Sequence, residues 1–327
     1  MELETRTTKS LWLRHESILL LLLVAEVLYF WAAGRRFATA DNVANMVRHS
    51  VEIGLLALVM TPIILTGGID LSVGSTLGLC AVIFGKLWRD AGFPPWIAGL
   101  CTLAIGALCG GCNALLITRL RLPPLIVTLG TFSLFRGLAE AMTEGVDAFT
   151  SFPASFLFLG TGAIGGLPTQ AWILLSLALG IWLLVHRTTF GRSFRAIGFS
   201  FEGARYAGLP VQRRVAFVYV LAGIVAALAA LTYTARFGTA KADAGMGYEL
   251  FAITAVVLGG TSIFGGTGSV HGTLLGVAAV AVLSNGLGRL PAAMNMASEL
   301  SGMLTGALLL IALAGGLLPR WLAHRRG

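Results

Sequence analysis

The feature that most constrains this chain is a series of ten apolar runs, each about as long as the roughly 20 residues that a helix needs to cross a membrane. Hydrophobic residues make up 56% of the 327 residues, which is more apolar surface than a soluble domain of this size can bury. The sequence therefore predicts an all-α, polytopic membrane protein with a single domain over residues 1–327. The runs lie at 17–33, 48–66, 73–91, 96–118, 124–142, 169–186, 215–234, 249–265, 270–288 and 297–315.

Basic residues predict the orientation of these spans, because loops rich in arginine and lysine stay on the cytoplasmic side. An even number of spans places both termini on the same side. If that side is the cytoplasm, the inner segments hold fourteen of the 23 basic residues. Arg35, Arg36 and Arg48 are exceptions, since they would lie near the outer face. We expect cytoplasmic termini in a multi-pass protein of the bacterial inner membrane.

The formal net charge of +8 raises the question of a nucleic acid partner. Twenty of the 23 basic residues are arginines, however, and they are scattered at the ends of the apolar runs. That distribution is typical of side chains that anchor helices at a membrane surface. We therefore expect membrane lipid, and no nucleic acid, as the partner of these charges.

One loop, residues 186–214, stands out as the longest strongly basic interruption, with six arginines against a single acid, Glu202. Its charge predicts a cytoplasmic loop. Within it, Ser200 can cap a short helix over 201–207, and Gly208 followed by Pro210 is the order expected at a helix C-terminus. A helix of two turns is too small to be a domain, so we expect it to dock onto a partner.

A second unusual stretch is Leu65-Thr-Gly-Gly-Ile-Asp-Leu-Ser-Val-Gly-Ser75, where a carboxylate sits between two apolar runs. An acid at the bilayer centre costs roughly 2.5–3.5 kcal/mol, so Asp70 needs a partner or a cavity. Asp70 can cap the following helix, or it can contact a substrate together with Ser72. The glycine-rich stretch 259–269 echoes this pattern. Both segments, 66–75 and 259–269, are predicted to be broken or re-entrant helices.

A charged pair is predicted inside the fifth run, where Arg136 and Glu140 are one helical turn apart. Counted from Pro124, Arg136 lies roughly 18 Å into the membrane. The two side chains can line a polar translocation path, or they can reach back to the outer surface. Asn113, Thr128, Thr131 and Asn285 are further candidates for this path, although each can equally form a bond between helices.

Two sets of residues resemble known permeases. Glu202-Gly-Ala-Arg-Tyr-Ala-Gly208 resembles the E-A-A-x-x-x-G loop of ABC importer permeases, with Gly203 in place of the first alanine. In that family the loop is the coupling helix, which sits in a groove of a cytoplasmic ATPase. The resemblance implies that Ser200, Glu202, Gly203, Ala204, Arg205 and Gly208 form the ATPase-coupling segment.

The stretch around Asp70 resembles the G-G-I-D-L-S-V-G-S signature of the ribose-type sugar permeases of ABC importers. Residues 122–131, 191–193 and 253–269 agree with the same family in the same order. The resemblance implies a dimeric pore made with a second permease subunit, identical or different, a separate cytoplasmic ATPase and a periplasmic sugar-binding protein. The implied cargo is a monosaccharide or related small sugar, such as a pentose, a rhamnose-like deoxyhexose or an autoinducer.

No motif for chemistry within the chain is found. None of the three lysines stands in a phosphate-binding loop, so ATP hydrolysis is expected on another chain. Cys109-Gly-Gly-Cys112 has the spacing of a redox or metal site, but it lies within an apolar run with no second cysteine pair and no nearby histidine. The histidines show no metal-ligand spacing, and no metal site, catalytic residue or cofactor is predicted. Two alternatives stay open: an ion-coupled secondary transporter, and an ABC permease for nucleosides or branched-chain amino acids. The long outer segment 143–168 is predicted to lack ordered secondary structure.

Overall fold

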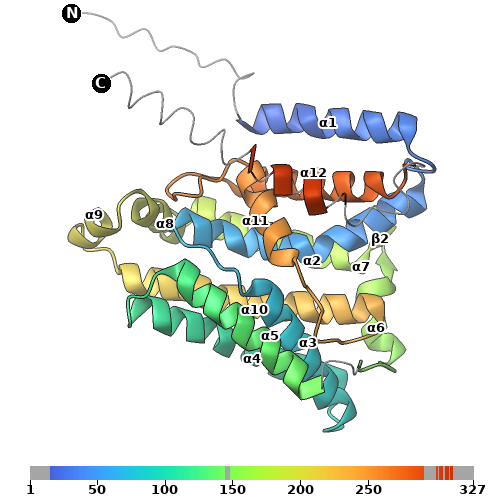
Figure 1. The fold of residues 1–327 in the computed structure, drawn as a ribbon, viewed down its shortest axis with the longest axis horizontal. Helices are drawn as coiled ribbons and strands as arrows, with labels where there is room; N and C mark the ends of the chain where they lie inside the picture. Colours follow the sequence, from blue (N-terminus) through green and yellow to red (C-terminus); the bar gives the residue numbers. More distant parts are fainter. Residues whose placement is uncertain are drawn as a thin grey trace, which may run out of the picture.

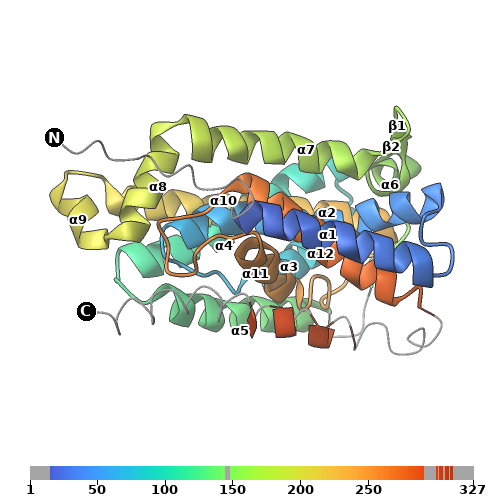
Figure 2. The same ribbon diagram turned by 90° about the horizontal axis from the view of Figure 1, so that it is seen from above.

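A computed structural model describes residues 15–143 and 148–290, together with residues 300, 302–304, 306–308, 310 and 311. The described chain is mostly helical and contains almost no β-strand, which confirms the all-α class. Its long helices lie side by side and follow the long axis of the molecule (Figures 1 and 2). The elements are α1 (His15–Ala33), α2 (Ala40–Leu65), α3 (Val73–Arg89), α4 (Pro95–Thr118), α5 (Pro124–Thr143), α6 (Ala154–Thr161), β1 (Ala163–Ile164), β2 (Leu167–Pro168), α7 (Thr169–Trp182) continued by a π-helical turn (Leu183–Arg187), α8 (Thr189–Phe199), α9 (Phe201–Tyr206), α10 (Val211–Phe237), α11 (Tyr248–Leu258) and α12 (Val270–Leu287).

Among the described residues, seven helices are long and apolar enough to cross a membrane: α1, α2, α4, α5, α7 with its π turn, α10 and α12. The polytopic membrane class is therefore supported, and the count of ten spans stays a prediction. α3 has 17 residues and carries Lys86 and Arg89 in its last turn, whereas α11 has only 11 residues. Most of the tenth predicted run, 297–315, lies outside the described residues.

The two ends of the bundle differ. α8 and α9 lie at one end, and α6 with the β1–β2 hairpin lies at the other (Figures 1 and 2). The hairpin pairs Ala163 with Pro168 and Ile164 with Leu167. The prediction of no ordered structure over 143–168 is therefore wrong for 154–168. Residues 144–147 lie outside the described residues.

α10 is the helix around which its neighbours pack, with α4, α2, α3 and α6 in contact. Glycines allow α4 and α10 to approach until their backbones touch. A Cβ atom on Gly106 would meet the carbonyl oxygen of Gly223, and one on Gly223 would meet the carbonyl oxygen of Gly106. Such small residues are typical of helices that cross closely within a membrane.

α1 has the opposite character, since it lies at the periphery against α12 (Figure 1). Its hydropathic pattern has almost no amphipathic bias, and large apolar side chains cover most of its surface. Ile18, Leu21 and Trp31 are more than half exposed in the isolated chain. In a membrane this surface faces lipid, as expected for an edge helix of a bundle.

Two helices are each followed by a non-helical break. α2 contains Pro62 and ends three residues later at Leu65, and the chain stays non-helical until α3 begins at Val73. α11 is likewise followed by the non-helical segment 259–269 before α12. Both predicted breaks are therefore present. The predicted apolar run 249–265 was too long, because Gly259 and Gly260 end the helix.

Candidate functional site

The break before α3 is organised by Asp70, which is 2% exposed. Its Oδ1 atom accepts hydrogen bonds from the backbone N–H of Ser72 at 2.8 Å and from the Ser72 hydroxyl at 2.6 Å. Ser72 is the N-cap residue of α3, and its own side chain caps no amide. Asp70 therefore bonds the N-cap residue of α3 and not the amides of its first turn, which the capping hypothesis named, and its carboxylate lies at the positive end of α3.

Two neighbouring helices extend this hydrogen bonding. The Asn113 side chain in α4 donates to the Ser72 hydroxyl at 2.8 Å, and the Thr131 hydroxyl in α5 donates to the Asn113 carbonyl oxygen at 2.7 Å. The Thr128 hydroxyl donates to the carbonyl of Ile69 at 3.1 Å. We call the connected side chains Asp70, Ser72, Asn113 and Thr131 the polar chain. All four are buried, and they join α3, α4 and α5 at the break.

Arg136 does not pair with Glu140. Its guanidinium donates to the carbonyl oxygens of Ala242 and Ala244, and also to that of Gly74 at 3.4 Å. The ion pairs of the described residues do not include the predicted pair, and Glu140 is exposed. The side chain of Arg136 therefore turns inward toward α3 instead of reaching for the membrane surface.

The carbonyls that hold Arg136 belong to a non-helical stretch between α10 and α11. This stretch lies against the first turns of α3, since a Cβ atom on Gly78 would meet the carbonyl of Ala242. Glu249, in the first turn of α11, lies beside Gly74 and has a buried Oε2 atom without a hydrogen-bond partner. The first turns of α3 and α11 thus meet at Gly74. Sequence analysis missed Glu249, although an acid at the start of an apolar run is a usable signal.

A buried ion pair forms a separate cluster. Arg236 Nε in α10 lies 3.1 Å from Glu52 Oε1 in α2, and both side chains are less than a tenth exposed. Gln170 in α7 donates to Glu52 at 3.4 Å and to the carbonyl of Thr232 at 3.0 Å. The pair ties three helices together. Sequence analysis missed it because the partners are distant in the chain and no spacing rule connects them.

Asn285 lies in another part of the bundle. Its side chain exchanges hydrogen bonds with Asn42 at 2.8 and 3.2 Å and so joins α12 to α2. The alternative of a bond between helices therefore holds for Asn285.

The basic loop folds as its sequence predicts. The Ser200 hydroxyl accepts a hydrogen bond from the Gly203 N–H at 3.0 Å and caps α9. Gly208 ends the turn with φ of 79°, a conformation that glycine adopts easily. Phe199 and Tyr206 are each 88% exposed, while Ala204 is buried against the bundle. The α8–α9 junction lies at one end of the molecule (Figures 1 and 2), and Phe199 of α8 and Tyr206 of α9 are exposed there.

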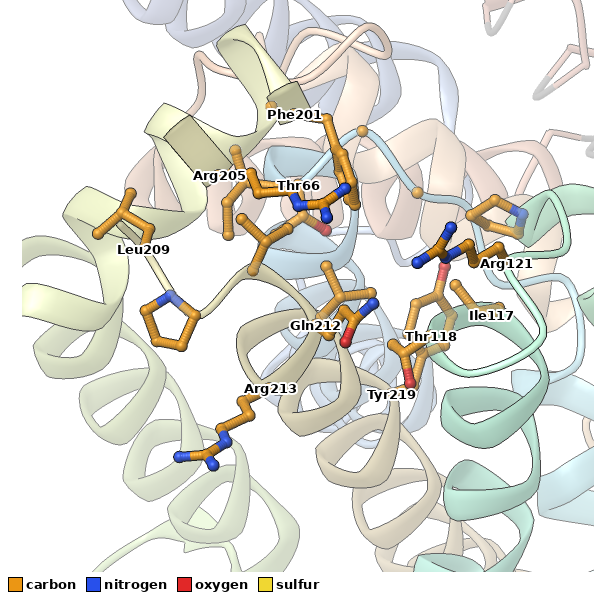
Figure 3. A pocket seen from close by; sticks show the side chains of 18 of the residues that line it. Thr66, Ile117, Thr118, Arg121, Phe201, Arg205, Leu209, Gln212, Arg213 and Tyr219 are labelled. Atoms are coloured by element: carbon orange, nitrogen blue, oxygen red, sulfur yellow. The ribbon is translucent and has the colours of Figure 1, made fainter. Parts of the chain in front are cut away.

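A cavity of about 900 Å³ lies behind α9 (Figure 3). Its wall includes the break after α2, the turn between α4 and α5, the α8–α9 junction and the start of α10. Tyr219 lines it from α10 and lies beside Gly68, two residues before Asp70. Tyr219 was also missed, because an aromatic residue in an apolar helix gives no sequence signal. The cavity therefore adjoins both the coupling segment and the break that carries the polar chain.

Comparison with known proteins finds similarity to transport permeases along nearly the whole chain. A family profile described as "Branched-chain amino acid transport system / permease component" matches residues 42–313. The chain is 38% identical over 323 residues to the "Autoinducer 2 import system permease protein LsrD" of Yersinia pseudotuberculosis (strain IP 31758), which covers 95% of this chain and 96% of that protein. The protein of the same name from Yersinia pestis (strain Pestoides F) is similar to the same extent.

These matches confirm the resemblance drawn from the motifs. They include every element from α2 to α12, and thus both breaks, the polar chain and the basic loop. The relatives are transport subunits and not enzymes, in agreement with the missing phosphate-binding loop. The chain belongs to this permease family and is a ribose-type permease subunit of an ABC importer.

Proposed function

We propose that this chain carries a small neutral sugar, of the size of a pentose, a deoxyhexose or autoinducer 2, across the bacterial inner membrane. The observation that carries the proposal is the 38% identity, over 95% of the chain, to permeases named for autoinducer 2 import. In this proposal both termini face the cytoplasm, ten helices span the membrane, and residues 1–327 form one permease domain.

The polar chain supports a sugar over an amino acid. Asp70, Ser72, Asn113 and Thr131 provide hydroxyl, amide and carboxylate groups, which bind sugar hydroxyls by exchanging one hydrogen-bond partner for another. An amino acid would need a cation for its carboxylate, and Arg136 is engaged with carbonyl oxygens. In our scheme the polar chain opens as α3 moves, and the substrate takes the place of its internal bonds. Arg136 holds the non-helical stretch between α10 and α11 against α3, and Glu140 faces outward.

The coupling segment, residues 200–208, is proposed to bind a separate cytoplasmic ATPase. Its exposed side chains include Glu202, Arg205 and Tyr206. The capped start and the glycine end make α9 a stiff element, so that movement of the ATPase passes to α8 and α10 on either side. The opposite end, with α6 and the hairpin, would receive a periplasmic sugar-binding protein, and a second permease subunit would complete the pore.

Recovery of an ATPase subunit tests the coupling part of the proposal. The chain is expressed with a C-terminal tag in its native host, extracted in mild detergent and captured. We expect a nucleotide-binding subunit in the captured complex and its loss when Phe201, Arg205 and Tyr206 are replaced together by alanine. A fully active transporter that never retains such a subunit would favour the ion-coupled alternative.

Uptake into sealed proteoliposomes that contain the complete importer tests which substrate is transported. We expect labelled autoinducer 2 or ribose, but not leucine, to accumulate in an ATP-dependent manner. Thr131→Val, which removes one hydroxyl from the polar chain at constant shape, should raise the KM for the sugar. Preferential accumulation of leucine would overturn the sugar assignment while leaving the family membership intact.

A further inference from the structure

The cavity behind α9 has a chemical character that neutral sugar transport does not use. None of the described residues that line it is Asp or Glu, whereas Arg121, Arg205 and Arg213 all border it. Glu202, the nearest acid in sequence, is not among the lining residues. The wall of this cavity is therefore uniformly positive where it is charged at all.

Two of the three arginines face the cavity. Arg121, from the turn between α4 and α5, and Arg205, from α9, point toward each other from opposite sides, while Arg213 points away (Figure 3). Within the part of the chain that the structure describes, neither Arg121 nor Arg205 has an ion pair, a side-chain hydrogen bond or an aromatic ring beneath it. By contrast, the guanidinium of nearby Arg214 stacks on the ring of Phe190, with Cζ 3.6 Å from the ring centroid.

Arg121 is also held in an unusual backbone conformation. Its φ is 57°, in the left-handed region that residues with a side chain rarely occupy. The two prolines that follow the turn, Pro123 and Pro124, restrict the backbone there. A strained residue that is kept facing a cavity is typical of a binding site.

Helix ends add to the positive character. The first residues of α10, Val211 and Gln212, and the first residue of α5, Pro124, line the cavity. Both helices exceed 18 residues. At α10 the Val211 N–H donates to the carbonyl of Leu209 at 2.8 Å, and the N-cap, Pro210, provides no side-chain acceptor for the amide of Gln212. Pro124 has no N–H, so α5 contributes only the partial charge of its first turn. The N-termini of long helices carry partial positive charge and unpaired N–H groups, which favour anions.

The floor of the cavity contains an unsatisfied donor. Tyr219 is fully buried by its neighbours, lines the cavity, and has a hydroxyl without a hydrogen-bond partner. Buried hydroxyls are usually hydrogen-bonded, so the Tyr219 hydroxyl has a donor that a ligand in the cavity can use. A phosphate oxygen accepts such a bond, in addition to those from the two guanidinium groups.

From these observations we infer that the cavity behind α9 is a binding site for the phosphate group of an anionic ligand, held between Arg121 and Arg205 with Tyr219 beneath it. A cavity of about 900 Å³ is large enough for a sugar phosphate. The same phosphate chemistry is found in the headgroup of an acidic phospholipid. Because Arg205 also belongs to the coupling segment, an occupied site holds α9 against the turn between α4 and α5.

Binding to the purified chain tests this inference without the ATPase or any transported sugar, so its outcome is independent of the proposed function. The chain is placed in nanodiscs of phosphatidylcholine and titrated by calorimetry with glucose 6-phosphate, inorganic phosphate and, as a neutral control, glucose. We expect saturable binding of glucose 6-phosphate and phosphate and none of glucose. Arg121→Gln and Arg205→Gln should each weaken phosphate binding about tenfold, because each removes a charged hydrogen bond.

Two further variants distinguish specific phosphate binding at the site from non-specific attraction to positive charge. Arg213→Gln removes the same charge from the cavity rim, but its side chain points away, and phosphate affinity should stay within about twofold of wild type. Tyr219→Phe keeps the ring and should weaken binding about threefold to tenfold. An equal loss in Arg213→Gln and Arg205→Gln, or glucose binding as tight as that of glucose 6-phosphate, would refute the site.

A lipid arm identifies the source of the phosphate. The titrations are repeated in nanodiscs that contain phosphatidylglycerol, and bound lipid is quantified after detergent exchange. If phosphatidylglycerol reduces phosphate binding to the wild type and to Arg213→Gln, but not to Arg121→Gln or Arg205→Gln, the site is supported and its occupant is a lipid. Free phosphate binding that phosphatidylglycerol does not affect supports a soluble occupant. If neither phosphate nor phosphatidylglycerol binds in a way that depends on these two arginines, the inference is wrong.

Discussion

The break before α3 and the cavity behind α9 are neighbours, yet their charged side chains differ in whether they are bonded within the chain. At the break, Asp70 and Arg136 are buried or half-buried and bonded within the chain. At the cavity, Arg121 and Arg205 have no partner among the described residues. A charged group inside a membrane must be compensated by other groups of the protein. A charged group at the surface is solvated by water and stays available to a ligand or a partner protein.

This difference separates residues that hold the bundle together from residues that face outward to be bound. Substitutions of the first kind outside the polar chain, which we propose also binds the sugar, should reduce stability, and transport only as a consequence. Substitutions in the coupling segment should leave the bundle stable and affect transport alone. Measurements of both quantities on the same variants can therefore support the comparison or break it.

The largest loss of stability is expected from Arg236→Met, which leaves Glu52 buried without its cation. Breaking one partner of a buried pair costs roughly 3–5 kcal/mol. Unfolding of the purified chain by SDS in mixed micelles measures the change. The double variant Glu52→Leu with Arg236→Met removes both charges and should recover most of the stability. A single variant as stable as wild type would show that the pair contributes nothing.

Arg136→Ala should follow, because the carbonyls of Ala242, Ala244 and Gly74 lose their donor. Hydrogen bonds to charged groups contribute about 1.5–3 kcal/mol. Uptake should fall, while recovery of the ATPase stays unchanged. Glu140→Gln is the matched control from the same helix: it is exposed, and its free energy of unfolding should change by less than about 0.5 kcal/mol. Equal effects of the two variants would restore the idea of an Arg136–Glu140 pair.

Gly208→Val should abolish uptake with membrane insertion intact. Nothing lies within 4 Å of a Cβ atom there, so the cost comes from φ of 79° and not from a clash. Such strain costs roughly 1–3 kcal/mol, and it falls on the end of α9. Gly208→Asn tolerates this conformation better and should keep partial uptake. Normal uptake by the valine variant would contradict the coupling role of this turn.

Ser200→Ala should have a smaller effect, because it removes only the cap of α9. Loss of an N-cap costs about 1 kcal/mol of helix stability. We expect ATP hydrolysis by the assembled importer to become less dependent on the substrate, with a modest fall in uptake. Ser200→Asp restores an acceptor and serves as the control. A cap variant with unaltered coupling would mean that α9 forms only upon docking.

The smallest effect is expected at Asp90, beyond the far end of α3. Arg89 Nε donates to its carboxylate at 2.8 Å, and this hydrogen bond lowers the pKa of Asp90 below its ordinary value. Any stabilisation is present above the ordinary pKa of aspartate and is lost as pH falls through the lowered value. Because the group is exposed and screened, Asp90→Asn should leave the unfolding midpoint unchanged near neutral pH. A clear shift there would contradict this ranking.

The sequence predicted local features better than long-range ones. The cap at Ser200, the stop at Gly208 and the breaks near residues 66–75 and 259–269 follow from turn and capping chemistry, which depends on adjacent residues. Helix lengths were less accurate: α2 begins at Ala40 and not at 48, because Thr39 caps a polar first turn that hydropathy does not register.

Pairings between distant segments could not be predicted. One-turn spacing favoured Arg136 with Glu140, but the nearest acceptors are carbonyls of a stretch about a hundred residues later. The same limit hid the Glu52–Arg236 pair and the contact of Tyr219 with Gly68. The four residues of the polar chain were each named as candidates for the substrate path, which stays a prediction. Their connection through Ser72 and Asn113 could not be predicted, because it depends on how three helices pack.

The most direct test of the account is a photo-crosslink from α9. A photoreactive amino acid replaces Tyr206, which is 88% exposed on α9, or Ile164, which is 50% exposed in the hairpin at the opposite end. Each variant is produced with the complete importer and irradiated in membranes. The account predicts an adduct between the permease and the ATPase from position 206 and none from position 164. An importer that hydrolyses ATP and transports, but gives the ATPase adduct only from position 164, would contradict it.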